Sequence, residues 1–140
     1  MQDKDQVVGE LNALLEAERA GARVGAALME ETKGGTYEGL AKVIHDDEVR
    51  WARALFEALK TLEATPSDKV GDFYERCIAI EGIEARLAFL NRGQGWVVRK
   101  LRELLPRIEG ESFAPTLQEM LEAHVVNIDA ANAALEAAKG

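Results

Sequence analysis

Glycine and proline are so widely spaced in this chain that they leave long uninterrupted segments, and this spacing constrains the fold more than any other feature. The 140 residues contain 12 glycines and only 3 prolines. Within the segments, apolar residues recur at three- and four-residue spacing, which is typical of amphipathic helices. Alanine and leucine are abundant, and no stretch shows the alternation that is typical of a strand. The sequence therefore predicts an all-α fold.

Four long helices and one short helix are predicted from the breaks between segments. Lys33-Gly34-Gly35 ends the first helix, Thr65-Pro66 the second and Arg92-Gly93-Gln94-Gly95 the third, and Pro106 ends a shorter piece. The predicted helices cover about residues 5–32, 36–64, 72–91, 96–105 and 112–138. This pattern predicts a single domain over residues 1–140, a four-helix bundle with a short extra helix before the last helix.

Each long segment has an inner face that its apolar spacing defines. The first and last segments are expected to bury Val8, Leu11, Leu15, Ala22, Ala26 and Met29, and Phe113, Leu117, Leu121, Ile128 and Leu135. The second and third are expected to bury Tyr37, Ala41, Ile44, Trp51, Leu55, Leu59 and Leu62, and Phe73, Cys77, Ile80, Leu87 and Leu90.

The overall charge, the hydropathy and the cysteine count disfavour several kinds of partner and location. The net charge is −8 and the isoelectric point is about 4.8, which disfavours nucleic acid and anionic lipid as partners. No apolar run is long enough to span a bilayer, and the start of the chain lacks the pattern of a secretory signal. The single cysteine cannot form an intramolecular disulfide. We therefore expect a cytoplasmic protein that does not associate with membranes.

Polar residues interrupt the apolar faces near the midpoint of each long segment. Glu18 interrupts the first face, Glu48 the second, and Glu81 with Glu84 the third, while His124 lies between apolar residues of the fourth. Burying such groups without partners costs several kcal/mol. Because the midpoints of packed helices lie at one level, these side chains are predicted to converge in a metal site. Carboxylate and imidazole ligands suit iron or manganese.

Each of these residues also has a simpler interpretation. Glu18 and Glu48 could lie on solvated faces, and Glu81 and Glu84 could form ion pairs with nearby arginines. His124 could be a core histidine bonded to a carboxylate without any metal. All of these residues lie near the middle of their predicted helices, and this coincidence favours one shared metal site over the separate explanations.

The segment from Leu11 to Glu18 and the Glu-x-x pattern that begins at Glu48 together resemble the ferritin-like superfamily, which includes rubrerythrins, bacterioferritins and di-iron carboxylate oxidases. The likeness covers most of the chain by helix pattern. It implies ligand positions at Glu18, Glu48, at Glu81 or Glu84, and at His124. It also implies a non-haem iron or manganese protein that oxidises its metal with O₂ or peroxide. The chain is most similar to uncharacterised bacterial branches with an incomplete di-metal motif.

Two positions depart from the pattern of that superfamily. Trp51 stands where the second helix of the superfamily has histidine, and Leu121 stands at a glutamate position of the last helix. His45, one turn before Glu48, is a possible replacement for the missing histidine. With only one cysteine, the chain also lacks the four-cysteine iron site of full rubrerythrins. A mononuclear or weakened dinuclear site is therefore expected.

A basic segment supports a competing hypothesis from a different class. Between Arg86 and Arg107 six basic residues face one acid, in a chain that is acidic overall. Residues 92–107 could bind an anionic ligand or partner in a metal-free interaction or dimerisation module, or the basic groups could pair with acidic helices. A homodimer is expected in either case. Residues 63–72 reach about 33 Å when extended, which permits a crossover along the bundle but does not exclude a simple up-down topology.

Overall fold

The computed structural model describes residues 3–139, and these are organised as helices without any strand. The long helices are α1 (Lys4–Glu31), α2 (Glu38–Thr61), α4 (Ile83–Leu104) and α5 (Ala114–Lys139), and the short ones are α3 (Phe73–Ile78) and the 3₁₀ turn η1 (Leu105–Arg107). None of these helices combines the length and the apolar character needed to cross a membrane. The all-α prediction is confirmed.

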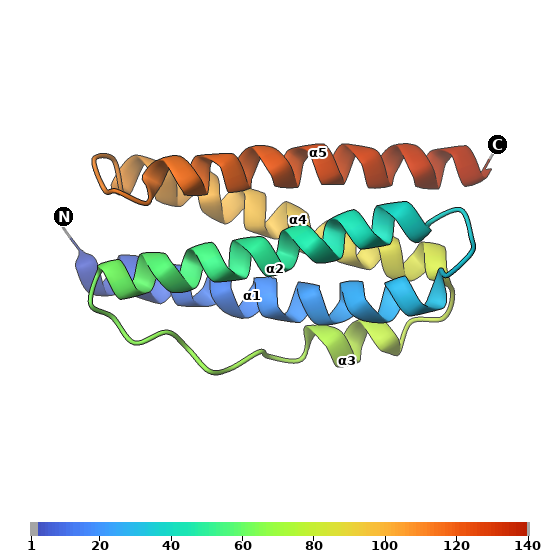
Figure 1. Cartoon of the computed structure of the whole chain (residues 1–140), viewed down its shortest axis with the longest axis horizontal. Coiled ribbons are helices and arrows are strands. Elements are labelled where there is room, and N and C mark those ends of the chain that lie inside the picture. Colours follow the sequence, from blue (N-terminus) through green and yellow to red (C-terminus); the bar gives the residue numbers. More distant parts are fainter. Residues whose placement is uncertain (1–2, 140) are drawn as a thin grey trace.

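A long crossover decides how the helices are connected. α1 and α2 run antiparallel, and so do α4 and α5 (Figure 1). Between α2 and α4 the chain returns along the length of the molecule over residues 62–82, a stretch that includes α3 (Figure 1). α2 and α4 consequently run in the same direction, and the topology is not a simple up-down arrangement.

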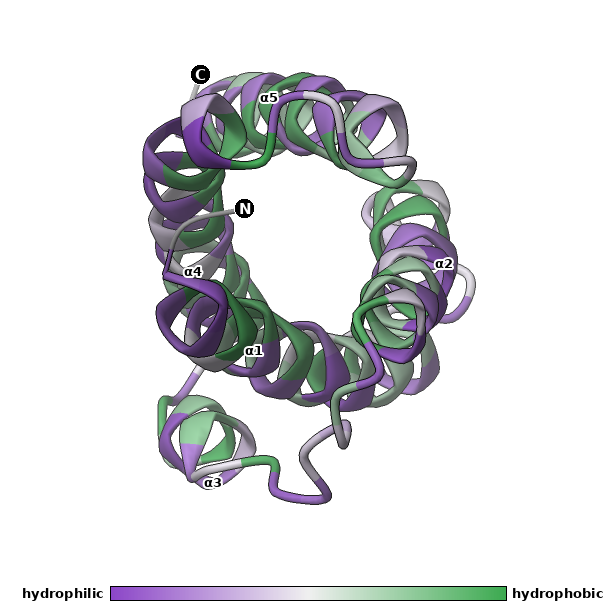
Figure 2. Cartoon of the chain, turned by 90° about the vertical axis from the view of Figure 1, so that its left-hand side faces the viewer, coloured by the Kyte–Doolittle hydropathy of each residue, from purple (hydrophilic) through white to green (hydrophobic). Residues whose placement is uncertain are grey.

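The four long helices surround one interior, which is lined by apolar residues (Figure 2). α1 contacts both α2 and α4, and α5 contacts the same two helices from the opposite side. α3 lies outside this ring, against α1 and α4. Residues from α1, α2, α4 and α5 can therefore meet in the interior, whereas α3 can only cover it from outside.

Hydrogen bonds fasten the crossover to α1. The Asn12 side chain donates to the Thr65 carbonyl at 3.3 Å and accepts from the Ser67 amide at 2.7 Å. Arg19, two turns after Asn12 on α1, donates to the Ser67 carbonyl. These contacts satisfy backbone groups of a segment that has no helix or sheet partner of its own.

The prediction of one helix over residues 72–91 is wrong, and so is the predicted break at Arg92-Gly93-Gln94-Gly95. The helix ends near Ile78, and the next begins after Gly82, whose φ of 99° is a conformation that favours glycine. α4 then continues through Gly93 and Gly95, because a buried stripe from Leu87 to Leu104 spans both glycines. Packing outweighs the low helix propensity of glycine here. Residues 96–104 therefore belong to α4, and the helical structure described between α4 and α5 is the short turn η1.

The inner faces of α1 and α5 also differ in part from the prediction. In the second half of α1 the buried residues are Gly21, Val24, Gly25 and Leu28, whereas Ala22 and Met29 are half-buried and Ala26 is exposed. In α5 the buried stripe is Leu117, Met120, His124, Asn127 and Ala131, and the expected residues Leu121, Ile128 and Leu135 are half-buried beside it. On the crossover side Phe73 and Ile80 are also only half-buried. The predicted face of α2 is buried throughout.

Two apolar clusters fill the interior, one toward each end of the bundle. The first includes Leu11, Leu15, Trp51, Leu55, Val97, Leu101, Leu117 and Met120, and the second includes Val24, Leu28, Ile44, Leu87 and Leu90. They leave a level between them that is occupied by polar side chains, which are described in the next subsection.

Replacing Gly25 with alanine is expected to destabilise the fold, whereas the same change at Gly9 is not. A Cβ at Gly25 would lie 3.0 Å from both Cα and Cβ of His45, so α1 and α2 would have to separate. We expect a loss of about 1–3 kcal/mol in the free energy of unfolding. Gly9 has nothing within 4 Å of that position, and Gly9→Ala should gain about 0.5–1 kcal/mol. Urea unfolding followed by circular dichroism tests both, and equal effects would contradict the close approach at Gly25.

Candidate metal centre

Each long helix contributes one buried polar side chain to the level between the two apolar clusters. On α1 Glu18 lies between Leu15 and Val24, and on α2 Glu48 lies between Ile44 and Trp51. The corresponding residues on α4 and α5 are Gln94 and His124. All four residues are at most 2% exposed. The interior therefore holds a polar layer that is closed on both sides by apolar residues.

Three of these side chains come close enough to share one ion. Glu18, Glu48 and His124 each offer a ligand atom, and these atoms lie within 4.8 Å of one another. His124 Nε2 is 2.8 Å from Glu18 Oε1 and 3.8 Å from Glu48 Oε1. The convergence predicted for these three residues is confirmed.

The other ring nitrogen of His124 determines which proton the imidazole carries. Nδ1 lies 2.8 Å from the Met120 carbonyl oxygen, which can only accept a hydrogen bond, so Nδ1 carries a proton. In the neutral ring Nε2 is then an unprotonated nitrogen with a lone pair directed at the carboxylates. Metal-binding histidines commonly hold their second nitrogen in this way against a backbone carbonyl.

Several polar atoms of the group have no hydrogen-bond partner. Glu18 Oε1, Glu48 Oε2 and His124 Nε2 are all buried and unpartnered among the described residues. The Glu18 and His124 atoms approach to 2.8 Å without hydrogen-bond geometry. Buried polar atoms are rarely left unsatisfied in proteins, so three unpaired atoms on side chains that meet in one group indicate a place for a further group.

A glycine on α1 makes room for the second carboxylate. A Cβ at Gly21 would lie 2.7 Å from Glu48 Oε2 and 2.9 Å from its Cδ. Any larger residue at this position would displace the carboxylate. Gly21 therefore lets α2 place Glu48 against the backbone of α1.

Burial raises the pKa of both carboxyl groups. For Glu18 it raises the pKa to about 7, against the opposing effect of a hydrogen bond with Glu48, while the charge of Asp47 adds to the rise. For Glu48 burial again dominates, the charge of Glu18 adds to it, and the pKa lies well above its ordinary value. Without a cation, the pair therefore retains protons at pH values where exposed glutamates have lost them.

Asp47 and Asn127 form a second polar contact beside the group. The Asn127 amide donates to Asp47 Oδ2 at 2.8 Å, and Asn127 is 5% exposed. The bond joins α2 to α5 next to Glu48 and His124. It fixes the relative register of the two helices at the level of the site.

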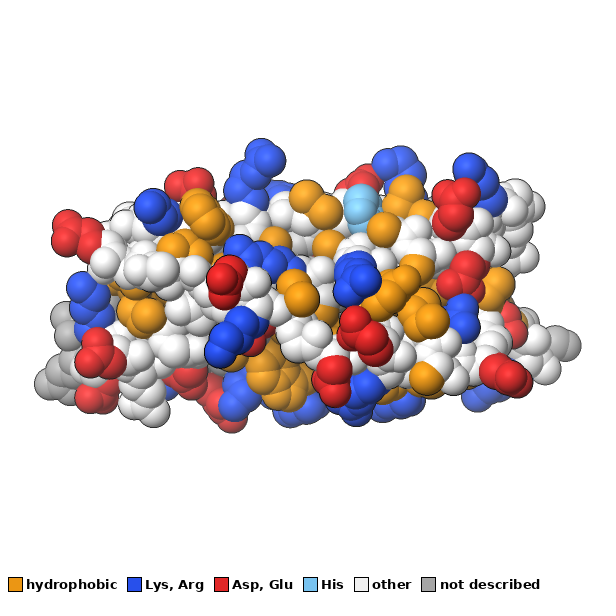
Figure 3. All heavy atoms as spheres, turned by 90° about the horizontal axis from the view of Figure 1, so that it is seen from below, with side chains coloured by type: hydrophobic (Ala, Val, Ile, Leu, Met, Phe, Trp, Pro, Cys, Tyr) orange, Lys and Arg blue, Asp and Glu red, His pale blue; other side chains and the backbone are white. Residues whose placement is uncertain are grey.

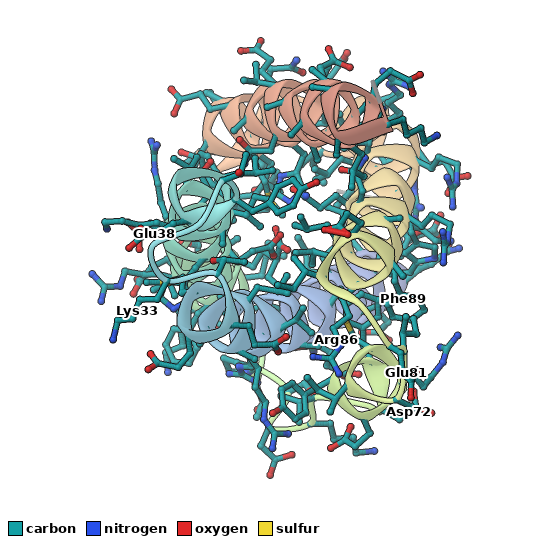
Figure 4. All side chains as sticks on the ribbon, turned by 90° about the vertical axis from the view of Figure 1, so that its right-hand side faces the viewer. Lys33, Glu38, Asp72, Glu81, Arg86 and Phe89 are labelled. Carbon is teal, nitrogen blue, oxygen red and sulfur yellow. The ribbon has the colours of Figure 1, made fainter. Side chains whose placement is uncertain are left out.

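The structure does not bring Glu81, Glu84 or His45 into this group. Glu81 precedes α4 and lies outside the ring of long helices (Figure 4), and Glu84 is exposed in the first turn of α4. His45 is half-buried, and its Nδ1 lies 3.0 Å from the exposed Asp46. The prediction that Glu81 and Glu84 converge with the others is wrong, because α4 begins later than expected and its midpoint lies near Gln94.

Two residues of this level escaped the sequence analysis. The glycines on both sides of Gln94 predict a turn there, although its spacing from Leu90 and Val97 is also that of a helix face. Gly21 carries no sequence signal, since its role depends on a side chain of another helix. Trp51, which stands where the superfamily has histidine, is 1% exposed and packs in the first apolar cluster.

The basic segment is partly neutralised within the chain. Arg86 contacts Glu31 at 2.6 Å, and Arg107 contacts Glu10, so both pair with acids of α1. Among residues 3–139, three arginines of the segment are exposed and form no ion pair, namely Arg92, Arg99 and Arg102. Pairing with acidic helices of the same chain therefore accounts for only part of the basic segment.

Fold and site together define an all-helical protein with a buried group of two carboxylates and one imidazole. Residues 5–134 match the family described as a domain of unknown function, DUF6306, and the chain belongs to that family. No curated protein and no solved structure matched the chain. The chemistry of the site is therefore argued from its own geometry.

The stability of the protein freed of divalent metal is expected to fall as the pH rises from about 4.5 to about 7. The pKa of Glu18 is higher in the folded state than its ordinary value of 4.5, so the folded state binds its proton more tightly. This contribution is complete below pH 4.5 and is lost as the pH approaches 7. It amounts to about 3 kcal/mol.

Urea unfolding of chelator-treated protein at pH 5 and pH 8 measures this loss. Glu18→Gln should reduce the difference between the two pH values. The exposed Glu57 on α2 provides the control, because Glu57→Gln should leave the wild-type difference in place. An unchanged difference in Glu18→Gln would contradict the raised pKa.

Proposed function

We propose that this protein is a ferritin-like metal-binding protein in which Glu18, Glu48 and His124 hold one iron or manganese ion. The observation that carries the proposal is the convergence of ligand atoms from three helices within 4.8 Å. In the same group Glu18 Oε1, Glu48 Oε2 and His124 Nε2 have no hydrogen-bond partner among the described residues. Each of the three residues is at most 2% exposed, so solvent does not satisfy these atoms.

Charge balance favours a divalent cation over protons as the partner of the group. Two carboxylates and a neutral imidazole carry a charge of −2, and a divalent ion neutralises it while accepting electron pairs from all three ligands. Mixed carboxylate and imidazole ligands suit iron and manganese, and a site lacking thiolates is less typical of structural zinc.

The ligand count favours one ion over two. Among residues 3–139, Glu18, Glu48 and His124 are the group whose ligand atoms converge. α4, which would have to supply further carboxylates for a dinuclear site, contributes the neutral amide of Gln94 at this level. The proposed site is therefore mononuclear.

The topology also supports the ferritin-like assignment. Ferritin-like bundles contain one long crossover among four helices. Here residues 62–82 run along the molecule between α2 and α4 (Figure 1). Metal sites of such bundles lie in the core, on side chains of facing helices, which is the level at which this group lies.

The residues around the ion would have separate roles. Glu18 and Glu48 bind and neutralise it, Met120 orients the His124 ring through its carbonyl, and the apolar clusters exclude water from both ends of the site. Bound iron or manganese supplies one-electron redox chemistry toward O₂ or peroxide. The buried surroundings have a low dielectric constant, which strengthens the attraction between the ion and its carboxylate ligands.

Wild-type protein is expected to bind about one equivalent of Mn(II), and Glu48→Ala and His124→Ala should each reduce this below a tenth of an equivalent. Each variant removes one of three ligands. Mass spectrometry of metal content after anaerobic Fe(II) addition, and Mn(II) titration by electron paramagnetic resonance, measure the stoichiometry. Glu84→Ala is the matched control, because this glutamate is exposed and lies outside the group.

Metal below a tenth of an equivalent in wild-type protein would overturn the metal assignment. The competing hypothesis, a metal-free interaction or dimerisation module, would then be favoured, with the unpaired arginines of residues 92–107 as its anion-binding surface. An equal loss of metal in Glu84→Ala would place the site elsewhere.

Gly21→Ala is expected to weaken Mn(II) binding at least tenfold while the protein stays folded. The new Cβ would lie 2.7 Å from Glu48 Oε2, so the carboxylate has to move away from the group. Alanine also has a higher helix propensity than glycine, which favours α1. The Mn(II) titration is repeated on this variant with Gly9→Ala as the control, and wild-type affinity in Gly21→Ala would contradict the position assigned to Glu48.

A further inference from the structure

A cavity of about 440 Å³ lies beside the carboxylates, between α1, α4 and the crossover. Glu18 and Glu48 line it, and the segment from Val70 to Phe73 forms its wall on the crossover side. Figure 3 views the molecule from this side, where apolar side chains lie among charged ones of both signs. A cavity of about 150 Å³ already accommodates a benzene-sized molecule, and ligand sites start at about 300 Å³. The space is therefore sufficient for a small organic molecule.

Gln94 gives this cavity a polar point in a mostly apolar lining. Its neighbours in the lining include Leu90, Trp96 and Val97. Gln94 is 2% exposed, and neither its amide nitrogen nor its amide oxygen has a hydrogen-bond partner in the described chain. A buried amide that binds nothing costs stability, so its retention in an apolar wall points to a ligand that it serves.

The charges around the cavity restrict the ligand to neutral molecules. The four acidic residues of the lining, Glu16, Glu18, Glu48 and Asp72, repel anions, and the lining contains no lysine or arginine. Glu16 is half-buried and Asp72 is exposed, so solvent screens both. The buried pair is neutralised by protons or by the proposed ion, which removes the attraction for an organic cation.

We propose that this cavity binds a small neutral organic molecule with an apolar body and one hydroxyl or carbonyl group, which Gln94 holds by hydrogen bonds beside the carboxylates. The amide offers both a donor and an acceptor, so it can bind either group. That the ligand faces a metal rests on the proposed function, whereas occupation of the cavity does not. A small neutral organic molecule of this kind would then lie next to the proposed ion.

Calorimetric titration with 4-ethylphenol and with ethylbenzene tests the proposal, because the two probes differ by a single hydroxyl. Wild-type protein should bind 4-ethylphenol about fivefold more tightly, the value of one net hydrogen bond. Gln94→Leu should bind the two probes equally, and it removes an unpartnered polar group, so it should remain folded. A hydroxyl preference that persists in Gln94→Leu would overturn the role of Gln94.

A filling variant tests the cavity itself. Ala17 lines the cavity and is half-buried, so Ala17→Phe should abolish binding of both probes. Ala13, one turn earlier and exposed, provides the control, since Ala13→Phe should bind as wild type does. Equal binding by Ala17→Phe, or no binding of either probe by wild type, would overturn the proposal.

Titrations with and without Mn(II) separate this inference from the metal assignment. Binding of 4-ethylphenol to protein that takes up no Mn(II) would support the cavity and overturn only the metal site. Uptake of Mn(II) without binding of 4-ethylphenol would support the metal site and overturn the proposed ligand of the cavity. Tighter binding of 2-phenylethylamine than of 4-ethylphenol would overturn the restriction to neutral ligands.

Discussion

Two carboxylates are buried opposite an imidazole in the interior of the bundle, and this arrangement constrains both the stability and the ligand chemistry of the protein. Glu18 and Glu48 are removed from water at the level where four helices meet, and each would cost several kcal/mol if it stayed charged and unpaired. The raised pKa values of both groups express this cost. A fold that tolerates such a group has to neutralise it with protons or with a cation. Its stability and its ligand chemistry are therefore coupled.

The surrounding architecture holds this group in place from all sides. Apolar clusters close the level at both ends, the Met120 carbonyl sets the proton on His124, and a glycine on α1 leaves space for the Glu48 carboxylate. The crossover adds an asymmetry, because it covers α1 and α4 but not the opposite pair of helices. The site thus has ligand atoms on three helices and a cavity toward the fourth. An ion and an organic molecule would occupy different parts of one polar level.

Sequence patterns predicted much of the site, for a reason that is visible in particular residues. Glu18, Glu48 and His124 each interrupt an apolar stripe near the middle of a helix, and helices of similar length bring their middles together. The same argument failed for Glu81 and Glu84 because it depended on where the helix begins. Two glycines around Gln94 suggested a turn, whereas the packing of the bundle extends α4 through both of them. The polar residue near the middle of α4 is therefore Gln94, whose side chain is a neutral amide, and not one of the two glutamates.

The local sequence pattern is enough to predict the helical class, the approximate extent of α1, α2 and α5, and three polar interruptions of their inner faces. Periodicity over a few turns is sufficient for this, because side-chain direction along a helix repeats with the backbone. Packing between helices instead sets the crossover, the continuity of α4, the space at Gly21 and the cavity beside Gln94. These depend on contacts between residues far apart in the chain, whose free energy outweighs local propensity and leaves no mark on the local pattern.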